Sequence, residues 1–289
     1  MVDDLVRVND ALWVIQSAVH DAGYDFPFDR HFACSRPPPT SPVTALARVG
    51  GIADYPRYHQ RWLEEGVRLL HDPEQHRRAA ELPGWYPLLE GLTPRSLWFR
   101  DPPSIDAVAA QLGWPLFMKG TRTTAGQTHS LSLIRGPREF AAALRAYARN
   151  PLLHWQDIVL REFLPLRFVE DLGGDRIPSS FEFRTFWWNG ELVGFGRYWW
   201  EGQRYAPTDA ERAAAIALAA VAARQVAVPF LVVDVAQDTA GKWWVVECND
   251  GQESGFGDVD PVALWRAILG RVAPSPDVIM ASGRPAPPR

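Results

Sequence analysis

The sequence predicts an α/β protein of the α+β kind, because signals for antiparallel hairpins are combined with well-capped helices. Two apolar stretches, 181–200 and 230–257, each carry a tight-turn signal between runs rich in valine and aromatic residues. Around them lie amphipathic segments that begin with helix-capping residues. The chain has 289 residues, 47% hydrophobic and 22% charged, which suffices for two ordinary domains with a substantial core.

The first hundred residues mix short helical and strand patterns, and we expect a small α/β domain over residues 1–100. Leu12, Ile15 and Val19 lie on one stripe of a helix over 9–22. Further along, the patterns predict strands at 43–49, 67–70 and 95–99, a helix at 54–66 that ends at glycine, and a helix at 74–89 that Pro83-Gly84 interrupts.

A second group of elements occupies residues 101–272. Thr208 and Glu211 form a capping box for the clearest helix of this group. The expected elements are a helix at 104–112, a strand at 115–118 that ends in Lys119, a loop at 120–130, a strand at 131–134, a helix at 137–150, a strand at 157–164, a helix at 208–225 and a helix at 260–269. The proline-rich segment 273–289 has no periodic pattern, and we expect a disordered tail.

The hairpin at 230–257 carries acidic residues on an otherwise apolar surface. A turn centred on Ala240-Gly241 places Asp234 opposite Glu247, and strand alternation puts Asn249 on the same face as Glu247. Unpaired buried carboxylates are costly, so two of them side by side favour a cation between them. Oxygen-only ligands suit magnesium. The alternative is a half-exposed hairpin with ordinary solvent-facing acids.

The hairpin at 181–200 has a type I′ turn signal at Asn189-Gly190. This turn predicts that Glu182 lies opposite Arg197 and that Arg184 lies opposite Phe195, all on one face. A structural ion pair between Glu182 and Arg197 would account for those two charges but not for the positive charge of Arg184. A bound anion such as a phosphate accounts for this surplus charge.

The loop at 120–130 is rich in glycine and threonine and follows Lys119, one of only two lysines in the chain. Its backbone N–H groups and hydroxyls can fold over phosphates, although it lacks the sequence of a Walker P-loop. A plain flexible hairpin tip explains the composition equally well.

Composition excludes several classes of protein. The net charge of −4 argues against binding nucleic acid by bulk charge. Two cysteines, Cys34 and Cys248, make no disulfide framework or zinc motif. The longest apolar run, 213–223, is too short to span a membrane, and no targeting signal is evident. We therefore expect a cytoplasmic protein without a membrane anchor.

Four features now follow one another over about residues 100–271: the strand ending in Lys119, the small-residue loop, the REFL strand at 161–164, and the hairpin with Asp234, Glu247 and Asn249. This order resembles the ATP-grasp superfamily, mainly carboxylate–amine and carboxylate–thiol ligases. The two arginines after the REFL strand resemble its branch defined by two arginines and one lysine. The resemblance implies an ATP-grasp domain at 101–272, built of two subdomains with mainly antiparallel sheets and hinged near 161–164. The preceding segment 1–100 resembles the α/β domain that usually comes before it.

The resemblance also implies how ATP is held. Lys119 matches the lysine on the α- and β-phosphates, and the loop residues Thr123, Thr124 and Gly126 match the part that closes over the triphosphate. Backbone groups of Glu162 and Leu164 match those that bind the adenine edge, with Phe163 packed nearby, and Glu170 or Asp171 matches the acid on the ribose.

The remaining matches concern the transferred phosphate. Arg184 and Arg197 match the cations that hold the γ-phosphate or the acyl phosphate, which makes them catalytic candidates together with Lys119. The trio Asp234, Glu247 and Asn249 matches the ligands of magnesium, with manganese as an alternative. One departure is that no lysine precedes Lys119, where many members have one; Arg95 or Arg100 is a candidate replacement.

The function implied is an ATP- and magnesium-dependent ligase. It activates a carboxylate as an acyl phosphate and joins it to an amine, with release of ADP and phosphate. Small-molecule or peptide carboxylates and amines are the expected partners, without nucleic acid or membrane, and a homodimer is one of the open oligomeric states. An ATP-dependent phosphotransferase and a non-catalytic nucleotide-binding or protein-interaction module are the alternatives.

Overall fold

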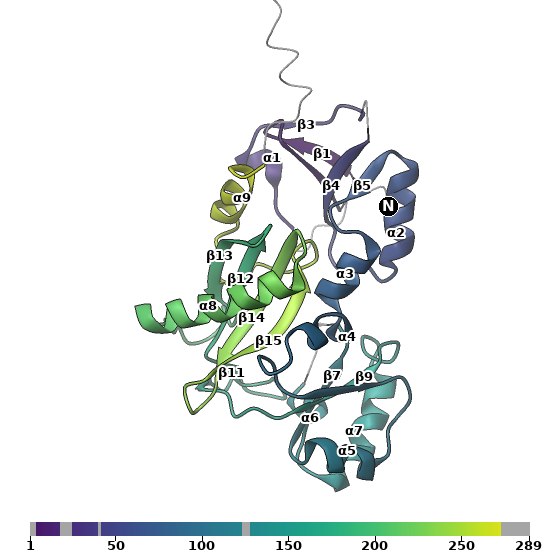
Figure 1. Cartoon of the computed structure of the whole chain (residues 1–289), viewed down its shortest axis with the longest axis vertical. Coiled ribbons are helices and arrows are strands. Elements are labelled where there is room, and N and C mark those ends of the chain that lie inside the picture. Colours follow the sequence, from purple (N-terminus) through teal and green to yellow (C-terminus); the bar gives the residue numbers. More distant parts are fainter. Residues whose placement is uncertain (1–3, 18–24, 40–41, 123–127, 273–289) are drawn as a thin grey trace, which may run out of the picture. The chain divides into compact units, whose positions relative to one another are not determined.

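The computed structural model describes residues 4–17, 25–39, 42–122 and 128–272 (Figure 1). The chain divides into two compact units. The first comprises Met1–Pro73, Gln252–Phe256 and Asp260–Arg289, and the second comprises Glu74–Gly251 and Gly257–Val259.

The first unit is built on a five-stranded sheet with the order β3-β1-β2-β4-β5. Its strands are β1 Asp4–Val8, β2 Leu12–Gln16, β3 Cys34–Ser35, β4 Val43–Arg48 and β5 Val67–Leu69, and its helices are α1 Phe28–His31, α2 Tyr55–Glu64 and α9 Pro261–Leu269. The pairs β2–β4 and β4–β5 are parallel, as expected for an α/β unit, whereas β1 pairs antiparallel with both neighbours.

The predicted helix at 9–22 is wrong over its described part, because residues 4–16 form the hairpin β1–β2. Asn9 and Asp10 both have positive φ, 47° and 53°, which is the backbone of a tight hairpin turn. The run from Leu12 to Ile15 is buried throughout. A continuous apolar run of this length fits a strand covered on both faces as well as one helical stripe.

The segment 252–256 belongs to the first unit through a buried arginine. The Nη1 of Arg48 donates to the carbonyl oxygens of Gln252 and Ser254 at 3.0 and 2.9 Å, and its guanidinium lies 4.8 Å from the ring of Phe256. Arg48 is 2% exposed. A fully charged side chain therefore fixes the path of the chain just after β15.

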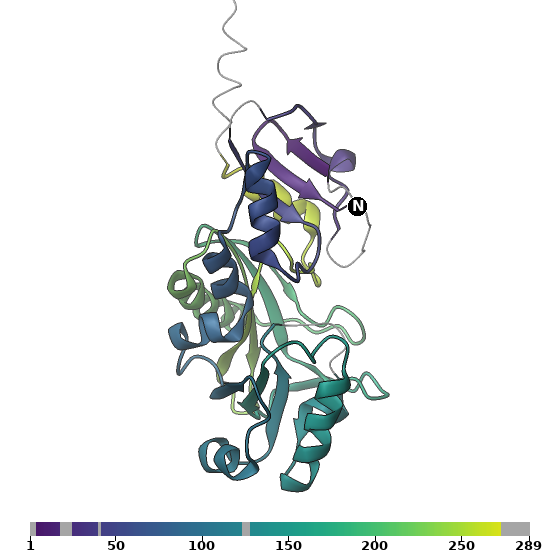
Figure 2. The same cartoon turned by 90° about the vertical axis from the view of Figure 1, so that its right-hand side faces the viewer.

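Among its described residues, the second unit contains two four-stranded antiparallel sheets, of which one has the order β6-β9-β7-β8. Its strands are β6 Ser96–Phe99, β7 Leu116–Gly120, β8 Leu133–Ile134 and β9 Ile158–Glu162, with helices α5 Ile105–Leu112, α6 His129–Ser132 and α7 Pro137–Arg149. Figure 1 and Figure 2 both show α7 alongside this sheet, where Phe140 and Tyr147 pack on Met118 and Leu160.

The other sheet of this unit has the order β13-β12-β14-β15. Its strands are β12 Glu182–Trp188, β13 Glu191–Arg197, β14 Phe230–Gln237 and β15 Trp243–Asp250. Helix α8, Asp209–Val226, begins with the predicted capping box of Thr208 and Glu211 and covers one face of the sheet (Figure 1). Its buried alanines pack there against Phe183 and Val233. The opposite face carries the polar residues described below.

Shorter elements complete the second unit. They are α3 Pro73–Ala80, α4 Leu82–Trp85, the 3₁₀ helix η1 Tyr86–Leu88, β10 Phe168–Glu170 and β11 Ser179–Ser180. The prediction of an α/β protein with mainly antiparallel sheets is thus confirmed. Among the described helices, none combines the length and the apolar character needed to cross a membrane.

The compact units do not follow the predicted boundary at residue 100. Strand β6 pairs with β9 from Ser96–Arg161 to Phe99–Ile158, and Leu82 and Trp85 join the core of the second unit. This unit therefore begins near residue 74, while α9 belongs to the first. Pairing between segments about 60 residues apart leaves no local signal in the sequence. The predicted tail 273–289 lies outside the described residues.

Candidate functional site

Asp234 lies opposite Glu247, as the sequence predicts, but a bulge is needed to bring this about. The connection between β14 and β15 is centred on Ala240, and near it Val235 faces Val245. Val246 is then an extra residue on β15, so that Asp234 pairs with Glu247 and Val232 pairs with Asn249. The bulge places both β15 side chains on the face of Asp234.

A second bulge contradicts the register predicted for the hairpin β12–β13. The predicted pairs hold beside the turn, where Trp188 faces Glu191, but beyond Val193 the partners shift by one residue. Arg184 therefore faces Gly196, and Phe183 faces Arg197. The expectation that Glu182 lies opposite Arg197, with both arginines on one face, is wrong. Nothing in the local sequence marks Val193 as the inserted residue.

Arg197 consequently lies on the face opposite to Arg184. Its Nε and Nη2 donate to the carboxylate of Asp258 at 2.8 and 3.1 Å, and its guanidinium lies 5.6 Å from the ring of Tyr205. Asp258 follows the glycine-rich segment after β15. Arg197 thus connects that segment to the sheet.

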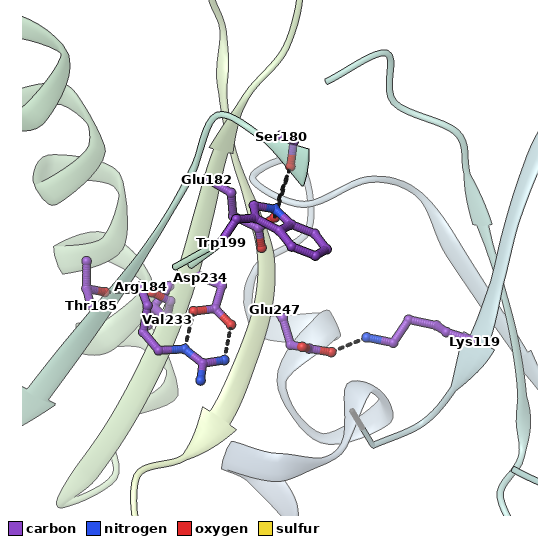
Figure 3. Close-up of polar contacts among 9 residues, drawn as sticks. All are labelled: Lys119, Ser180, Glu182, Arg184, Thr185, Trp199, Val233, Asp234 and Glu247. Atoms are coloured by element: carbon purple, nitrogen blue, oxygen red, sulfur yellow. Dashed lines mark hydrogen bonds and ion pairs between the residues drawn. The ribbon is translucent and has the colours of Figure 1, made fainter. Parts of the chain in front are cut away.

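The polar face of the sheet brings together Glu182 and Arg184 from β12, Asp234 from β14, and Glu247 and Asn249 from β15. Figure 3 shows the first four of these side chains. Arg184 donates from Nε to Oδ1 of Asp234 at 2.9 Å and from Nη2 to Oδ2 at 2.8 Å. Burial raises the pKa of Asp234, and Arg184 opposes that effect. Two parallel hydrogen bonds make this a strong, geometrically defined pair.

Lys119 reaches the same face from the other sheet of the unit. It lies near the end of β7, is 5% exposed, and forms an ion pair with Glu247, which is 7% exposed (Figure 3). Arg161 of β9 adds a second connection, since its Nη1 donates to the carbonyl oxygen of Val246 at 2.6 Å. Burial lowers the pKa of Arg161 to about 10. Cations of one sheet therefore meet anions and carbonyls of the other.

Glu182 is buried, and its Oε2 accepts hydrogen bonds from Ser180 Oγ at 3.0 Å and from Trp199 Nε1 at 3.1 Å. Burial, reinforced by the charge of Asp234, raises the pKa of Glu182 to about 8. The three carboxylates of this face thus have different surroundings: two have cationic partners, and one has neutral donors.

The donor set at the end of the hairpin fits a magnesium ion. Asp234, Glu247 and Asn249 offer two carboxylates and an amide, all with oxygen donors. The Asn249 side chain makes no hydrogen bond with any described residue, and its buried Nδ2 has no partner there. Carboxylate oxygens keep further lone pairs beside the hydrogen bonds they accept. Within the described part of the chain, no group of three or more His, Cys, Asp or Glu side chains is arranged as a metal site.

The predicted adenine and ribose residues lie at the end of β9 and beyond it. The N–H of Glu162 donates to the carbonyl oxygen of Arg95 at 2.8 Å, Phe163 is 36% exposed, and Leu164 is half-buried outside any strand. Glu170 accepts a hydrogen bond from the N–H of Gln203. Thr123, Thr124 and Gly126 lie outside the described residues.

Sequence reasoning missed a buried histidine beside the site. His76 Nδ1 lies 2.9 Å from Oδ2 of Asp250, and Arg122 Nη2 lies 3.2 Å from His76 Nε2. Arg122 opens the loop that follows Lys119, and the carbonyl oxygen of Thr121 accepts from the N–H of Leu82 at 2.8 Å. His76 and Asp250 are 174 positions apart. The one available signal was Asp250 itself, an acid that ends a buried strand.

Comparison with solved structures shows what this fold is similar to. A RimK domain ATP-grasp protein from Sphaerobacter thermophilus matches with a TM-score of 0.55 and 16% identity, over 80% of this chain and 81% of that one. D-alanine–D-alanine ligase from Bacillus anthracis matches with a TM-score of 0.52 and 12% identity, over 72% and 68%.

The purK enzyme N5-carboxyaminoimidazole ribonucleotide synthetase, solved with ADP, has a TM-score of 0.51 and 15% identity, over 72% of this chain and 53% of its own. At such identities the similarity concerns the fold alone. No curated protein matches the chain. Residues 111–268, more than half of the sequence, match the model of an ATP-grasp domain family, the third family of the clade named for two arginines and one lysine. The chain therefore belongs to this two-arginine, one-lysine clade of the ATP-grasp proteins.

Proposed function

We propose that this protein is an ATP- and magnesium-dependent ligase that activates a carboxylate as an acyl phosphate and joins it to an amine, releasing ADP and phosphate. The observation that carries the proposal is the pairing of Lys119 with Glu247 and of Arg184 with Asp234 on one buried face. Cations suited to phosphate and oxygen donors suited to magnesium alternate there, which is the charge pattern that phosphoryl transfer needs.

In this proposal each side chain has a distinct task. Lys119 contacts the α- and β-phosphates from the end of β7, and Arg184 holds the phosphoryl group that is transferred. Of the two arginines expected to do so, Arg184 alone lies on this face. Arg197 positions the segment after β15 through Asp258. The backbone at Glu162 and Leu164, with Phe163, receives the adenine, Glu170 the ribose, and Thr123, Thr124 and Gly126 the triphosphate.

Asp234, Glu247 and Asn249 hold magnesium, which neutralises phosphate charge when it is bound. On ligand binding, Lys119 would exchange Glu247 for a phosphate, and Glu247 would exchange Lys119 for the metal ion. Lys119 and Glu247 would each keep an oppositely charged partner after the exchange, so neither buried charge is left uncompensated. Burial of this face also protects an acyl phosphate from water.

The experiment that tests this function is phosphate release from ATP with panels of carboxylates and amines. A ligase releases ADP and phosphate when both a carboxylate and an amine are present, and it forms their amide. A phosphorylated product would instead indicate a phosphotransferase, and the absence of nucleotide turnover under all conditions would contradict catalysis.

The chain offers a matched control for this assay in its two lysines. Lys119→Ala is expected to abolish turnover, because it removes the phosphate contact and leaves Glu247 buried without this cation. Lys242→Ala removes an exposed lysine whose Nζ lies over the ring of Trp244, and it is expected to keep wild-type turnover. Equal loss in both variants would point to a general effect of charge.

A further inference from the structure

Glu182 is a buried carboxylate for which the fold provides no cation among the residues described. On the same face, Asp234 is paired with Arg184 and Glu247 with Lys119. The side-chain partners of Glu182 within the described ranges are the neutral donors Ser180 and Trp199. At 5% exposure, a carboxylate loses most of its hydration without gaining an opposite charge.

The hydrogen bonds of Glu182 do not explain why an ionisable residue occupies this buried position. A glutamine would accept from Ser180 Oγ and Trp199 Nε1 equally well and would avoid the cost of burying a charge. The raised pKa of Glu182, about 8, is a sign of that cost. A cation arriving next to Oε1 or Oε2 would remove it by stabilising the ionised form.

An indole lies beside this carboxylate, and two tyrosines lie nearby. Figure 3 shows the indole of Trp199 beside Glu182, and the ring of Tyr198 lies 5.1 Å from that of Trp199. The hydroxyl of Tyr205 donates to the main-chain oxygen of Glu182 at 2.6 Å, and this bond holds the segment that contains Tyr205 against β12. A carboxylate with an indole beside it suits an alkylammonium, whose charge can pair with the acid while its carbon atoms contact the ring.

Glu182 also stands close to the group assigned to phosphoryl transfer. It is two residues before Arg184 on β12, so both side chains point to one face, about 7 Å apart along the strand. A small group bound at Glu182 is therefore within reach of a carboxyl group activated at Arg184.

We propose that Glu182, with Trp199 as a wall, binds the ammonium group of the amine substrate. The inference rests on the proposed function, and it adds the residue that receives the amine and the form in which the amine arrives, a primary or secondary ammonium. Ser180 and Trp199 act as positioning residues that hold the carboxylate in place.

The test measures ammonium binding directly. Thermal unfolding is followed with ethylammonium chloride or tetramethylammonium chloride at equal millimolar concentration and ionic strength, with and without magnesium and ADP. Ethylammonium has N–H donors for Glu182, whereas tetramethylammonium has none. We expect ethylammonium to stabilise the wild type more than tetramethylammonium does, and Glu182→Gln to weaken its binding about tenfold or more.

The control is Glu201→Gln, which removes an exposed acid paired with Arg176 just beyond Trp199. It makes the same chemical substitution at an exposed position and should bind ethylammonium as the wild type does. Equal shifts with both cations, or an unchanged response in Glu182→Gln, would overturn the inference. The comparison of the two cations in the wild type does not depend on the folding of any variant. Stabilisation by magnesium and ADP is read separately, so its loss would count against the proposed function and not against ammonium binding.

Discussion

Arg184 and Asp234 face each other on adjacent antiparallel strands and share two parallel hydrogen bonds of 2.9 and 2.8 Å. Both residues are buried, and Asp234 is fully so. Arg184, which is suited to binding phosphate, and Asp234, which is suited to binding magnesium, thus form an ion pair with each other. The site keeps its shape through charges that its ligands would later engage.

Removing one member of this pair should destabilise the fold. Asp234→Ala leaves the guanidinium of Arg184 buried without this carboxylate, and we expect the free energy of unfolding to fall by about 3–5 kcal/mol. Urea unfolding with the midpoint and slope fitted separately measures the change.

The double variant Arg184→Met, Asp234→Leu is the control for that prediction. It replaces the pair by apolar side chains, and its stability should return to within about 1–2 kcal/mol of the wild type while turnover stays absent. If Asp234→Ala alone were as stable as the wild type, the pair would contribute nothing to the fold.

The stability of the protein should depend on pH through Glu182. Its pKa is about 8 in the fold, against an ordinary value of 4.5, so the folded protein retains a proton that the unfolded chain has released. Stability therefore falls as pH rises from about 5 to 8, by up to about 1.4 kcal/mol per pH unit from this group.

Glu182→Gln should flatten that profile and make the variant the more stable protein at the alkaline end. Asp234 also has a raised pKa, but it is present in both proteins, so the difference between the two profiles isolates Glu182. Parallel pH profiles from urea unfolding would show that Glu182 titrates normally.

Gly196 is required by the close approach of another part of the chain. A Cβ atom there would lie 2.7 Å from the main-chain nitrogen of Val259 and 2.8 Å from the carbonyl carbon of Asp258. Gly196→Ala should therefore push the segment away from β13, weaken the pair of Arg197 with Asp258, and cost about 1–3 kcal/mol.

Gly136 provides the matched control, because its backbone is extended (φ −178°) and a Cβ there would meet nothing within 4 Å. Gly136 is the N-cap of α7, where alanine is less favourable than glycine, so Gly136→Ala should cost no more than about 1 kcal/mol. Thermal unfolding of the two variants side by side distinguishes steric displacement from the general cost of replacing glycine.

Local patterns in the sequence predicted many individual elements well. The capping box at Thr208 and Glu211 and the turn at Asn189-Gly190 are both present, because each depends on residues that are neighbours in the chain. The pairing of Asp234 with Glu247 was also correct, although it needs the bulge at Val246, because the connection is centred on Ala240 and not between Ala240 and Gly241.

What the sequence could not show depends on packing between distant segments. The bulge at Val193 separated Arg197 from Arg184, and no local signal announces such an insertion. The pairing of β6 with β9 and the contact of His76 with Asp250 join residues far apart in the chain. The pair Asn9-Asp10 is a turn signal in the sequence, and both residues have positive φ in the structure. The apolar stripe of the following residues favoured a helix instead.

If this face binds nucleotide and magnesium together, Asn249→Ala should remove the magnesium-dependent part of that binding. The Asn249 side chain makes no hydrogen bond with the described residues, so the variant should fold with nearly wild-type stability in the absence of ligand. Thermal unfolding is measured for both proteins with ADP, with and without magnesium.

We expect magnesium with ADP to stabilise the wild type by about 2.7 kcal/mol at roughly 100 times the dissociation constant. In Asn249→Ala the part of this shift that depends on magnesium should be largely lost. An equal magnesium-dependent shift in both proteins would contradict the assignment of Asn249, and no shift in the wild type would contradict the nucleotide site itself.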